Sequence, residues 1–218
     1  MPHVLILGGS WFLGRALAEE AVSRQWAVTI LRRGRAESGA DPALGPGEYV
    51  GRTAWWLRRL RRAGEVVAPF PADRSIQPVD VRDVAAFALS APAGIFNVTT
   101  PGNDTFSEFI EACQKYAPAP DGTAVQWVDP EILTAHGVRQ WTELPLWRTY
   151  AGAWAVDSSR ARAAGLVTGP IADTVRDTAQ WLAAGGELVA SERAAELGLD
   201  PAKEMAILAD HQVRVSTS

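Results

Sequence analysis

The chain has 218 residues, of which 47% are hydrophobic and 21% charged, with a formal net charge of -4 at pH 7. This length suits one domain with a sizeable core, and the composition is ordinary for a globular protein. The acidic balance argues against nucleic acid as the main partner. One cysteine and three scattered histidines argue against an internal disulfide and a metal site.

Membrane insertion and secretion are not expected from this sequence. No apolar run approaches the roughly 20 residues that a helix needs to cross a bilayer. The N-terminus enters strand-like sequence at once and has no basic leader segment. We therefore expect a cytoplasmic protein with no membrane partner.

The first thirty-one residues have the pattern of a strand, a glycine-containing turn, a helix and a second strand. The strands are two short apolar runs, and the segment between them has the periodicity of a helix with one apolar side. The segments are residues 3–7, 8–14, 15–24 and 26–31. This order predicts a parallel crossover unit.

The turn in this unit has the glycines that a phosphate-binding turn requires. Gly8 allows a tight turn, a small residue at Ser10 leaves room for a pyrophosphate at the helix N-terminus, and Gly14 lets the helix approach the strand. Trp11 stands where a middle glycine is usual. The arginines after the second strand favour the 2′-phosphate of NADP, although a solvated basic turn is the alternative. The candidate cofactor-binding residues are Gly8, Ser10, Trp11, Phe12, Leu13, Gly14, Arg32 and Arg33.

Further along the chain, several segments resemble the extended short-chain dehydrogenase/reductases, the NAD-dependent epimerase/dehydratase family. They are the turn at 8–14, the Gly-Pro loop at 45–52, the strand-to-helix segment at 75–85 and the turn at 157–161. The resemblance implies an α/β fold: a shortened Rossmann-like, NAD(P)-binding domain with a small, mainly parallel sheet and helices on both faces. We expect a Rossmann-like core over residues 1–100 and a substrate-side subdomain over 101–218, joined as one unit.

The chain departs from this family at its catalytic segment. The family uses a tyrosine with a lysine four residues later, but Thr53, Pro120 and Trp154 follow the three tyrosines at that spacing. The sequence also passes directly from the second strand to the substrate-side half, so ordinary hydride transfer is not expected. The first strand would lose its usual neighbour. The exposed edge of the first strand could be covered by the strand near residues 76–79, or by the second subunit of a homodimer.

The substrate-side half contains clear helix signals. Thr105 and Glu108 have the spacing of a capping box, Asp83 is expected to cap a helix over residues 84–90, and residues 169–170 open an amphipathic helix. Residues 94–98 and 125–128 read as short strands.

The candidate substrate and catalytic residues lie mainly between residues 136 and 154. Trp141, Trp147 and Trp154 would form aromatic walls for a largely apolar ligand, unless they are simply core. Polar residues that could supply acid or base chemistry are Tyr49, Asp80, His136, Glu143 and Tyr150.

Three functions fit these observations. The first is a redox-neutral tailoring enzyme of bacterial secondary metabolism, such as a cyclase, isomerase or dehydratase acting on a small, largely apolar substrate. The second is an NADP-dependent oxidoreductase with non-standard catalytic residues. The third is a non-catalytic relative that binds a ligand or a partner protein, with a vestigial cofactor turn.

Overall fold

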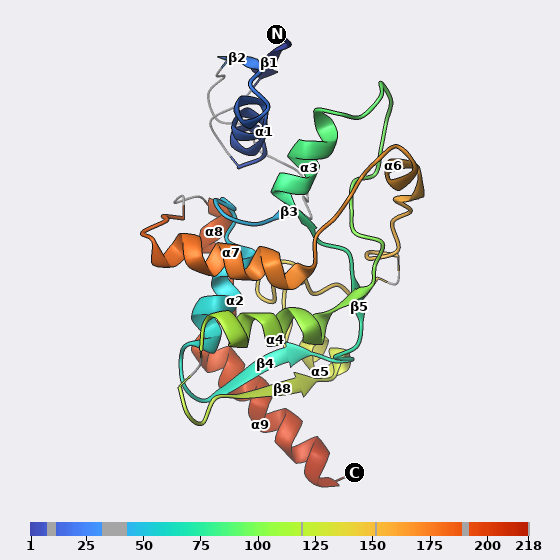
Figure 1. Cartoon of the computed structure of the whole chain (residues 1–218). Coiled ribbons are helices and arrows are strands. Elements are labelled where there is room, and N and C mark those ends of the chain that lie inside the picture. The colour runs from blue at the N-terminus through green and yellow to red at the C-terminus, as the bar shows by residue number, and fades with distance from the viewer. Residues whose placement is uncertain (8–11, 32–42, 119, 151, 189–191, 218) are drawn as a thin grey trace.

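The computed structural model shows an α/β protein in which short strands alternate with helices (Figure 1). It describes residues 1–7, 12–31, 43–118, 120–150, 152–188 and 192–217. The elements are β1 (His3–Leu7), α1 (Phe12–Ser23), β2 (Ala27–Leu31), β3 (Ala43–Leu44), α2 (Arg52–Leu60), β4 (Glu65–Pro69), β5 (Ser75–Ile76), β6 (Val79–Asp80), α3 (Val81–Ala88), β7 (Asp104–Thr105), α4 (Phe106–Tyr116), β8 (Ala124–Val128), α5 (Pro130–Ala135), α6 (Ser159–Ala163), α7 (Ile171–Ala183), α8 (Glu192–Ala195) and α9 (Pro201–Thr217).

The strands of the described chain pair two by two. β1 pairs with β2, β3 with β6 and β4 with β8, all in parallel, whereas the short pair β5–β7 is antiparallel. The predicted α/β class with small, mainly parallel sheets is therefore confirmed. The predicted cover for β1 is wrong for the described residues: residues 76–79 do not pair with it, because β5 and β6 pair with β7 and β3. Cover by a second subunit stays a prediction.

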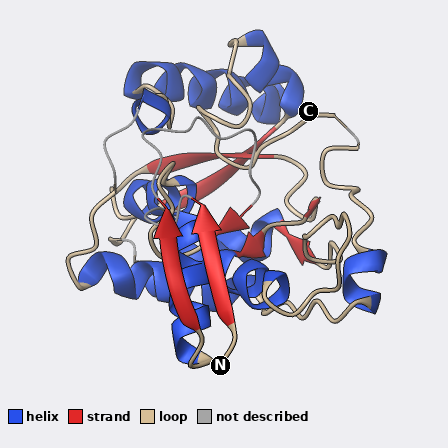
Figure 2. Ribbon diagram, turned by 90° about the horizontal axis from the view of Figure 1, so that it is seen from above, coloured by secondary structure: helices blue, strands red, loops and turns tan. Residues whose placement is uncertain are grey.

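The unit β1–α1–β2, called here the N-terminal unit, has the predicted crossover. The strands lie parallel, with His3 opposite Ala27 and Leu7 opposite Leu31, and they stand side by side in Figure 2. α1 buries Phe12, Ala16 and Ala21. Side chains alternate between the faces of a strand. Accordingly Ile6 is buried while Leu5 is 58% exposed, so one face of this strand pair is covered and the other is open.

The rest of the chain forms a layered body. α7 lies on α4, α4 lies between α7 and the β4–β8 pair, and α9 packs against these strands (Figure 1). Aromatic side chains from α2 and α4 meet at the centre of this body, with the rings of Trp56 and Phe106 edge to face at 5.7 Å. This main core draws on residues from both sides of position 100, including Leu44, Phe106 and Ile207. The domain boundary proposed there stays a prediction.

Local signals explain why several of these elements form where they do. The capping box at α4 is confirmed: the Thr105 hydroxyl accepts the Glu108 N–H at 3.2 Å, and the Glu108 carboxylate accepts the Thr105 N–H at 2.7 Å. At α5 the Asp129 carboxylate accepts the Glu131 N–H, and Pro130 takes the first helical position. Each of these contacts satisfies backbone donors that a helix N-terminus leaves free.

A buried ion pair attaches the C-terminal helix to the body. The carboxylate of Glu204 on α9 accepts from the Arg59 guanidinium at 2.9 Å and from the backbone N–H of Val67 on β4 at 3.2 Å. Both charged side chains are less than a tenth exposed. α9 therefore fixes the position of α2 and β4 at the same time.

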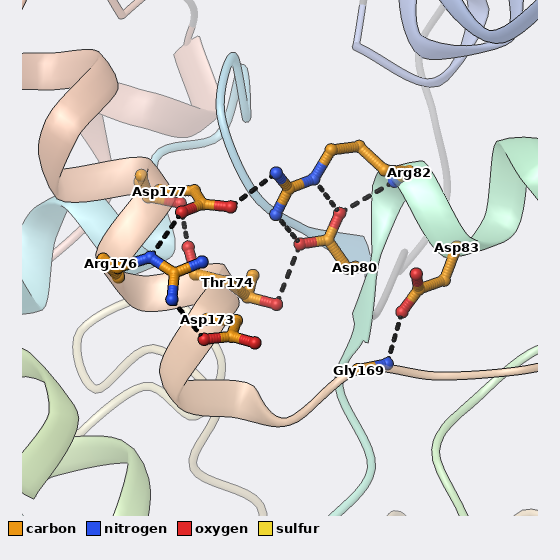
Figure 3. A network of polar contacts seen from close by, with 9 residues as sticks. Asp80, Arg82, Asp83, Gly169, Asp173, Thr174, Arg176 and Asp177 are labelled. Atoms are coloured by element: carbon orange, nitrogen blue, oxygen red, sulfur yellow. Dashed lines mark hydrogen bonds and ion pairs between the residues drawn. The ribbon is translucent and has the colours of Figure 1, made fainter.

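A second polar network joins the N-terminal end of α3 to α7 (Figure 3). Asp80 caps α3 and binds the Arg82 guanidinium, which also reaches Asp177 on α7 at 2.6 Å. Asp83 was predicted to be this cap, and that prediction is wrong. Its carboxylate accepts the N–H of Gly169 instead, and burial raises the pKa of Asp83.

One other expectation from the sequence is wrong, and one strand was missed. Residues 94–98 do not form a strand, although Phe96 packs on Phe87 with ring centroids 5.3 Å apart. β4 was not expected, yet its Val66, Val67 and Ala68 are fully buried. A short apolar run becomes a strand only where a partner strand is available, and β8 supplies that partner here.

Candidate functional site

The predicted cofactor turn is only partly within the described residues. Gly8, Ser10, Trp11, Arg32 and Arg33 lie outside them. Of the remaining three, Phe12 begins α1 and is buried, while Leu13 packs against the same cluster and Gly14 is half-buried in the first turn of the helix. The helix begins at Phe12, three residues before the predicted start at residue 15, so the last three residues of the predicted turn belong to α1.

Two of the candidate acid–base residues, Asp80 and Glu143, already form hydrogen bonds with other groups of the protein. Both carboxylate oxygens of Asp80 accept hydrogen bonds, two on each oxygen, from Arg82 and from the Thr174 hydroxyl (Figure 3). A carboxylate offers about four such positions, so Asp80 has no acceptor capacity left. Glu143 binds Lys203 at 2.8 Å and the N–H of Arg139 at 2.7 Å. Burial acts to raise the pKa of Glu143, but these bonds hold it below its ordinary value.

The other three candidates lie on different parts of the body. His136 ends α5 and contacts the Asp210 carboxylate on α9 at 3.3 Å. Tyr150 is 77% exposed, and Tyr49 is half-buried against the small cluster around Phe12. The structure therefore does not gather the five residues into one site. Their catalytic roles stay predictions.

Two of the three predicted substrate residues do meet in one cleft. Trp141 and Trp154 line a cleft of about 280 Å³, and their ring centroids are 5.6 Å apart. The lining residues are Gln77, Thr99, Trp141, Arg148, Ala153, Trp154 and Val156. We call this the Trp141–Trp154 cleft. Trp147, the third predicted residue, is 1% exposed and belongs to the main core.

The loop that carries Trp141 holds it in an unusual backbone conformation. Its φ of 71° lies in the left-handed region, which bulky residues rarely adopt. The Trp141 N–H donates to the Trp147 carbonyl at 3.2 Å, and the Gln140 amide is hydrogen-bonded to Thr149. These contacts close the loop and fix the ring against the cleft. Strained residues of this kind cluster at ligand sites.

Another part of the cleft lining is fixed by one buried amide. The Gln77 side chain donates to the carbonyls of Thr100 and Val156 and accepts the Val156 N–H at 2.7 Å. It therefore joins the segment after β5 to the segment after Trp154. Sequence reasoning had missed Gln77, because nothing in residues 75–80 indicates a partner 79 positions away.

Two cations lie over the Trp141 ring and differ in their partners. The Arg52 guanidinium is 5.1 Å from the ring centroid and also binds the Glu48 carboxylate at 2.7 Å. The Arg148 guanidinium is 4.8 Å from the centroid, and no side-chain acceptor within the described chain binds it. Arg148 is half-buried, and burial lowers the pKa of its guanidinium.

Two polar atoms in the residues that line the cleft also lack partners. The Thr99 hydroxyl and the Trp154 indole N–H are shielded from solvent, and no described residue bonds them. The described chain has seven buried side-chain polar atoms of this kind, and such groups call for an explanation. Those of Thr99 and Trp154 belong to the walls of the same cleft.

Other features of the described chain give weaker evidence for a functional site. A second cleft of about 210 Å³ lies between α2 and α8, lined by Trp55 and Arg58 among others, but it borders residues that are not described. No group of residues that could hold a metal ion is found in the described part of the chain. Within the same residues, none of the helices is both long and apolar enough to cross a membrane.

Comparison with known proteins leaves the family unassigned. No family model matches the chain, and no curated protein matches it. Solved structures do show similarity, and two of them are UDP-glucose 4-epimerases. The enzyme of Thermotoga maritima, with UDP-glucose, has 16% identity and a TM-score of 0.45 over 79% of this chain and 51% of that chain. The enzyme of Thermus thermophilus, with NAD, has 19% identity and a TM-score of 0.42 over 84% of this chain and 64% of that chain.

A third similar structure is a GDP-L-fucose synthetase from Naegleria fowleri bound to NADP, with 12% identity and a TM-score of 0.44. The alignment covers 79% of this chain and 50% of that chain. The chain thus spans about half to just under two thirds of the length of these three structures.

Proposed function

We propose that this protein binds a small, ring-containing molecule in the Trp141–Trp154 cleft. The observation that carries the proposal is the lining itself, in which two tryptophan rings and a half-buried arginine without an acidic partner line one cavity. Ligand sites are typically apolar and aromatic with a few polar groups that fix orientation. At about 280 Å³ the cleft lies at the lower end of the usual range of roughly 300–1,000 Å³. It suits one ring system with a short substituent, not a dinucleotide.

The composition of the cleft favours binding over catalysis. Among the described residues that line it there is no Asp, Glu, His, Lys, Cys or Tyr, and these residues supply most acid, base and nucleophilic groups. The tailoring reaction expected from the sequence would need such a group within hydrogen-bond reach of the ligand. A ligand-binding relative of the epimerase/dehydratase enzymes is therefore the function that the geometry supports best.

Filling the cleft tests this proposal. Ala153 lines the cleft and Ala155 is exposed beside it, so Ala153→Leu and Ala155→Leu form a matched pair. Two flat probes, 2-naphthoate and the neutral 2-naphthamide, would be titrated into each protein by calorimetry. We expect wild type and Ala155→Leu to bind at least one probe, and Ala153→Leu to lose at least tenfold in affinity. Failure of wild type to bind either probe would overturn the proposal.

A nucleotide cofactor is a separate proposal, which rests on the N-terminal unit. It is supported by the parallel β1–α1–β2 arrangement, in which α1 begins at Phe12, within the glycine-containing segment 8–14. Such a turn would hold the pyrophosphate, and Arg32 and Arg33 would favour NADP. The fit is partial, because the family's tyrosine and lysine for the nicotinamide ribose are absent from the sequence.

Titration with NADPH and NADH tests the cofactor proposal independently of the cleft. Nine tryptophans make energy transfer to a bound nicotinamide easy to observe. We expect NADPH to bind more tightly than NADH, and Gly8→Val to abolish binding of both. If neither nucleotide binds at millimolar concentration, the glycine turn serves only the packing of α1 on β1.

A further inference from the structure

We infer that the ligand of the Trp141–Trp154 cleft is a monoanion, a ring that carries one carboxylate, with Arg148 as its counter-ion. This inference rests on the proposed function and names the chemical class of the molecule bound.

The first support is the contrast between the two arginines over the Trp141 ring. Arg52 is almost fully buried, and its charge is balanced by Glu48 at 2.7 Å. Arg148 contacts the same ring, yet no described carboxylate and no described side-chain acceptor reaches its guanidinium. A partly desolvated charge without a counter-ion is unfavourable, and a bound anion would remove that cost. The contact with the ring leaves the guanidinium N–H donors without a described acceptor.

The second support is the charge count of the cleft. Arg148 is the one charged residue among those described as lining it. One cation balances one negative charge, whereas a phosphate carries about -1.5 to -2 at neutral pH and would stay partly unbalanced. The planar guanidinium also matches the geometry of a carboxylate, to which it can donate two parallel hydrogen bonds. The small cavity limits the rest of the molecule to one flat ring system.

The third support is a pair of donors that belong to residues lining the cleft. The Thr99 hydroxyl and the Trp154 indole N–H have no described partner. Both can donate to a carboxylate oxygen or to a second polar substituent on the ring. Because both atoms are screened from solvent, a small opening of the wall must accompany their use. The Trp154 N–H is therefore also a reporter for occupation of the cleft.

The test compares three probes that share a naphthalene ring: 2-naphthoate, neutral 2-naphthamide and 2-naphthyl phosphate. We expect wild type to bind the carboxylate tenfold to hundredfold more tightly than the amide, as a charge-assisted hydrogen bond allows. The carboxylate should also bind more tightly than the phosphate. In Arg148→Gln the preference for the carboxylate over the amide should disappear, with amide affinity unchanged. Arg61→Gln, at an exposed site at the end of α2, removes the same charge and should keep the preference.

A second measurement uses the wild-type protein and needs one variant only to assign the Trp154 signal. In a spectrum of the indole N–H groups, 2-naphthoate should shift the signal of Trp154, identified by its absence in Trp154→Phe. Added salt should lower the affinity for 2-naphthoate and leave the affinity for 2-naphthamide unchanged. If amide and carboxylate bind equally, if Arg148→Gln keeps the preference, or if the phosphate binds most tightly, the inference is overturned while the proposed function stands. If no probe binds wild type, both are overturned.

Discussion

The N-terminal unit and the layered body are stabilised in different ways. The main core is formed by side chains of the body, and no described residue before position 43 contributes to it. The N-terminal unit has a small cluster instead, in which Phe12 and Ala16 pack on Val79, Val81 and Ala85 from the body. The body therefore has a core of its own, whereas the small cluster of the N-terminal unit is completed by residues of the body. We expect the body to fold without help from the N-terminal unit, but not the reverse.

The largest effect should come from the centre of the body. Phe106 is 2% exposed and lies edge to face with Trp56, Phe109 and Trp127. Phe106→Ala should lower the free energy of unfolding by roughly 3–5 kcal/mol, measured by urea denaturation, because it leaves a cavity that the neighbours cannot fill. Tyr150→Ala, at a position 77% exposed, is the control and should change it by less than about 0.5 kcal/mol. A loss below about 1 kcal/mol for Phe106→Ala would contradict a tightly packed body.

The next largest effect concerns the ion pair between α9 and α2. Glu204→Gln removes the charge that balances buried Arg59, and we expect a loss of about 3 kcal/mol in the free energy of unfolding. The double variant Arg59→Met/Glu204→Leu should recover a large part of this loss, because no buried charge is then left alone. If the single and double variants are equally stable, the pair does not hold α9 to the body.

A smaller effect, with a defined pH dependence, is expected at Glu143. Its pKa is held below its ordinary value, so its contribution is complete above the pKa of the unfolded chain and is lost as the pH falls through the folded pKa. Glu143→Gln should cost about 1 kcal/mol or less at neutral pH. Denaturation at roughly pH 7 and pH 3 should show wild type and variant converging in acid. An equal difference at both pH values would exclude this ionisation as its cause.

The smallest effect on the body should come from the N-terminal unit. Phe12→Ala removes the largest side chain of the small cluster, so β1 and β2 should open locally. Hydrogen exchange should show faster exchange of the β1 and β2 amides, with protection of β4 and β8 unchanged. The global free energy of unfolding should change by less than about 0.5 kcal/mol, because the main core is untouched. Loss of protection in β4 would show that the two regions unfold together.

The sequence predicted those features that depend on near neighbours. The β1–α1–β2 unit follows from apolar runs on either side of a glycine turn, and the capping box follows from Thr105 and Glu108, three positions apart. The gathering of Trp141 and Trp154 was also anticipated, since both lie in one stretch of the chain.

Features that depend on distant partners could not be predicted. Asp80 was one of five candidate catalytic residues, and its bond to Thr174 joins residues 94 positions apart, which no local pattern indicates. β4 was missed because its partner, β8, follows about sixty residues later. Arg148 was passed over because an arginine in a loop is ordinarily solvated. Only its place over Trp141 and the lack of a carboxylate partner in the described chain distinguish it.

The backbone at Trp141 bears on how this sequence would change over generations. At a φ of 71° glycine is the favoured residue, and asparagine is tolerated far better than a large aromatic side chain. Under selection for folding alone, mutation would therefore tend to replace this tryptophan with glycine or asparagine. We expect related chains that have lost the ligand to carry one of those residues at position 141. Chains that keep a tryptophan there, against the preference of the backbone, would be those still selected for what the ring contacts.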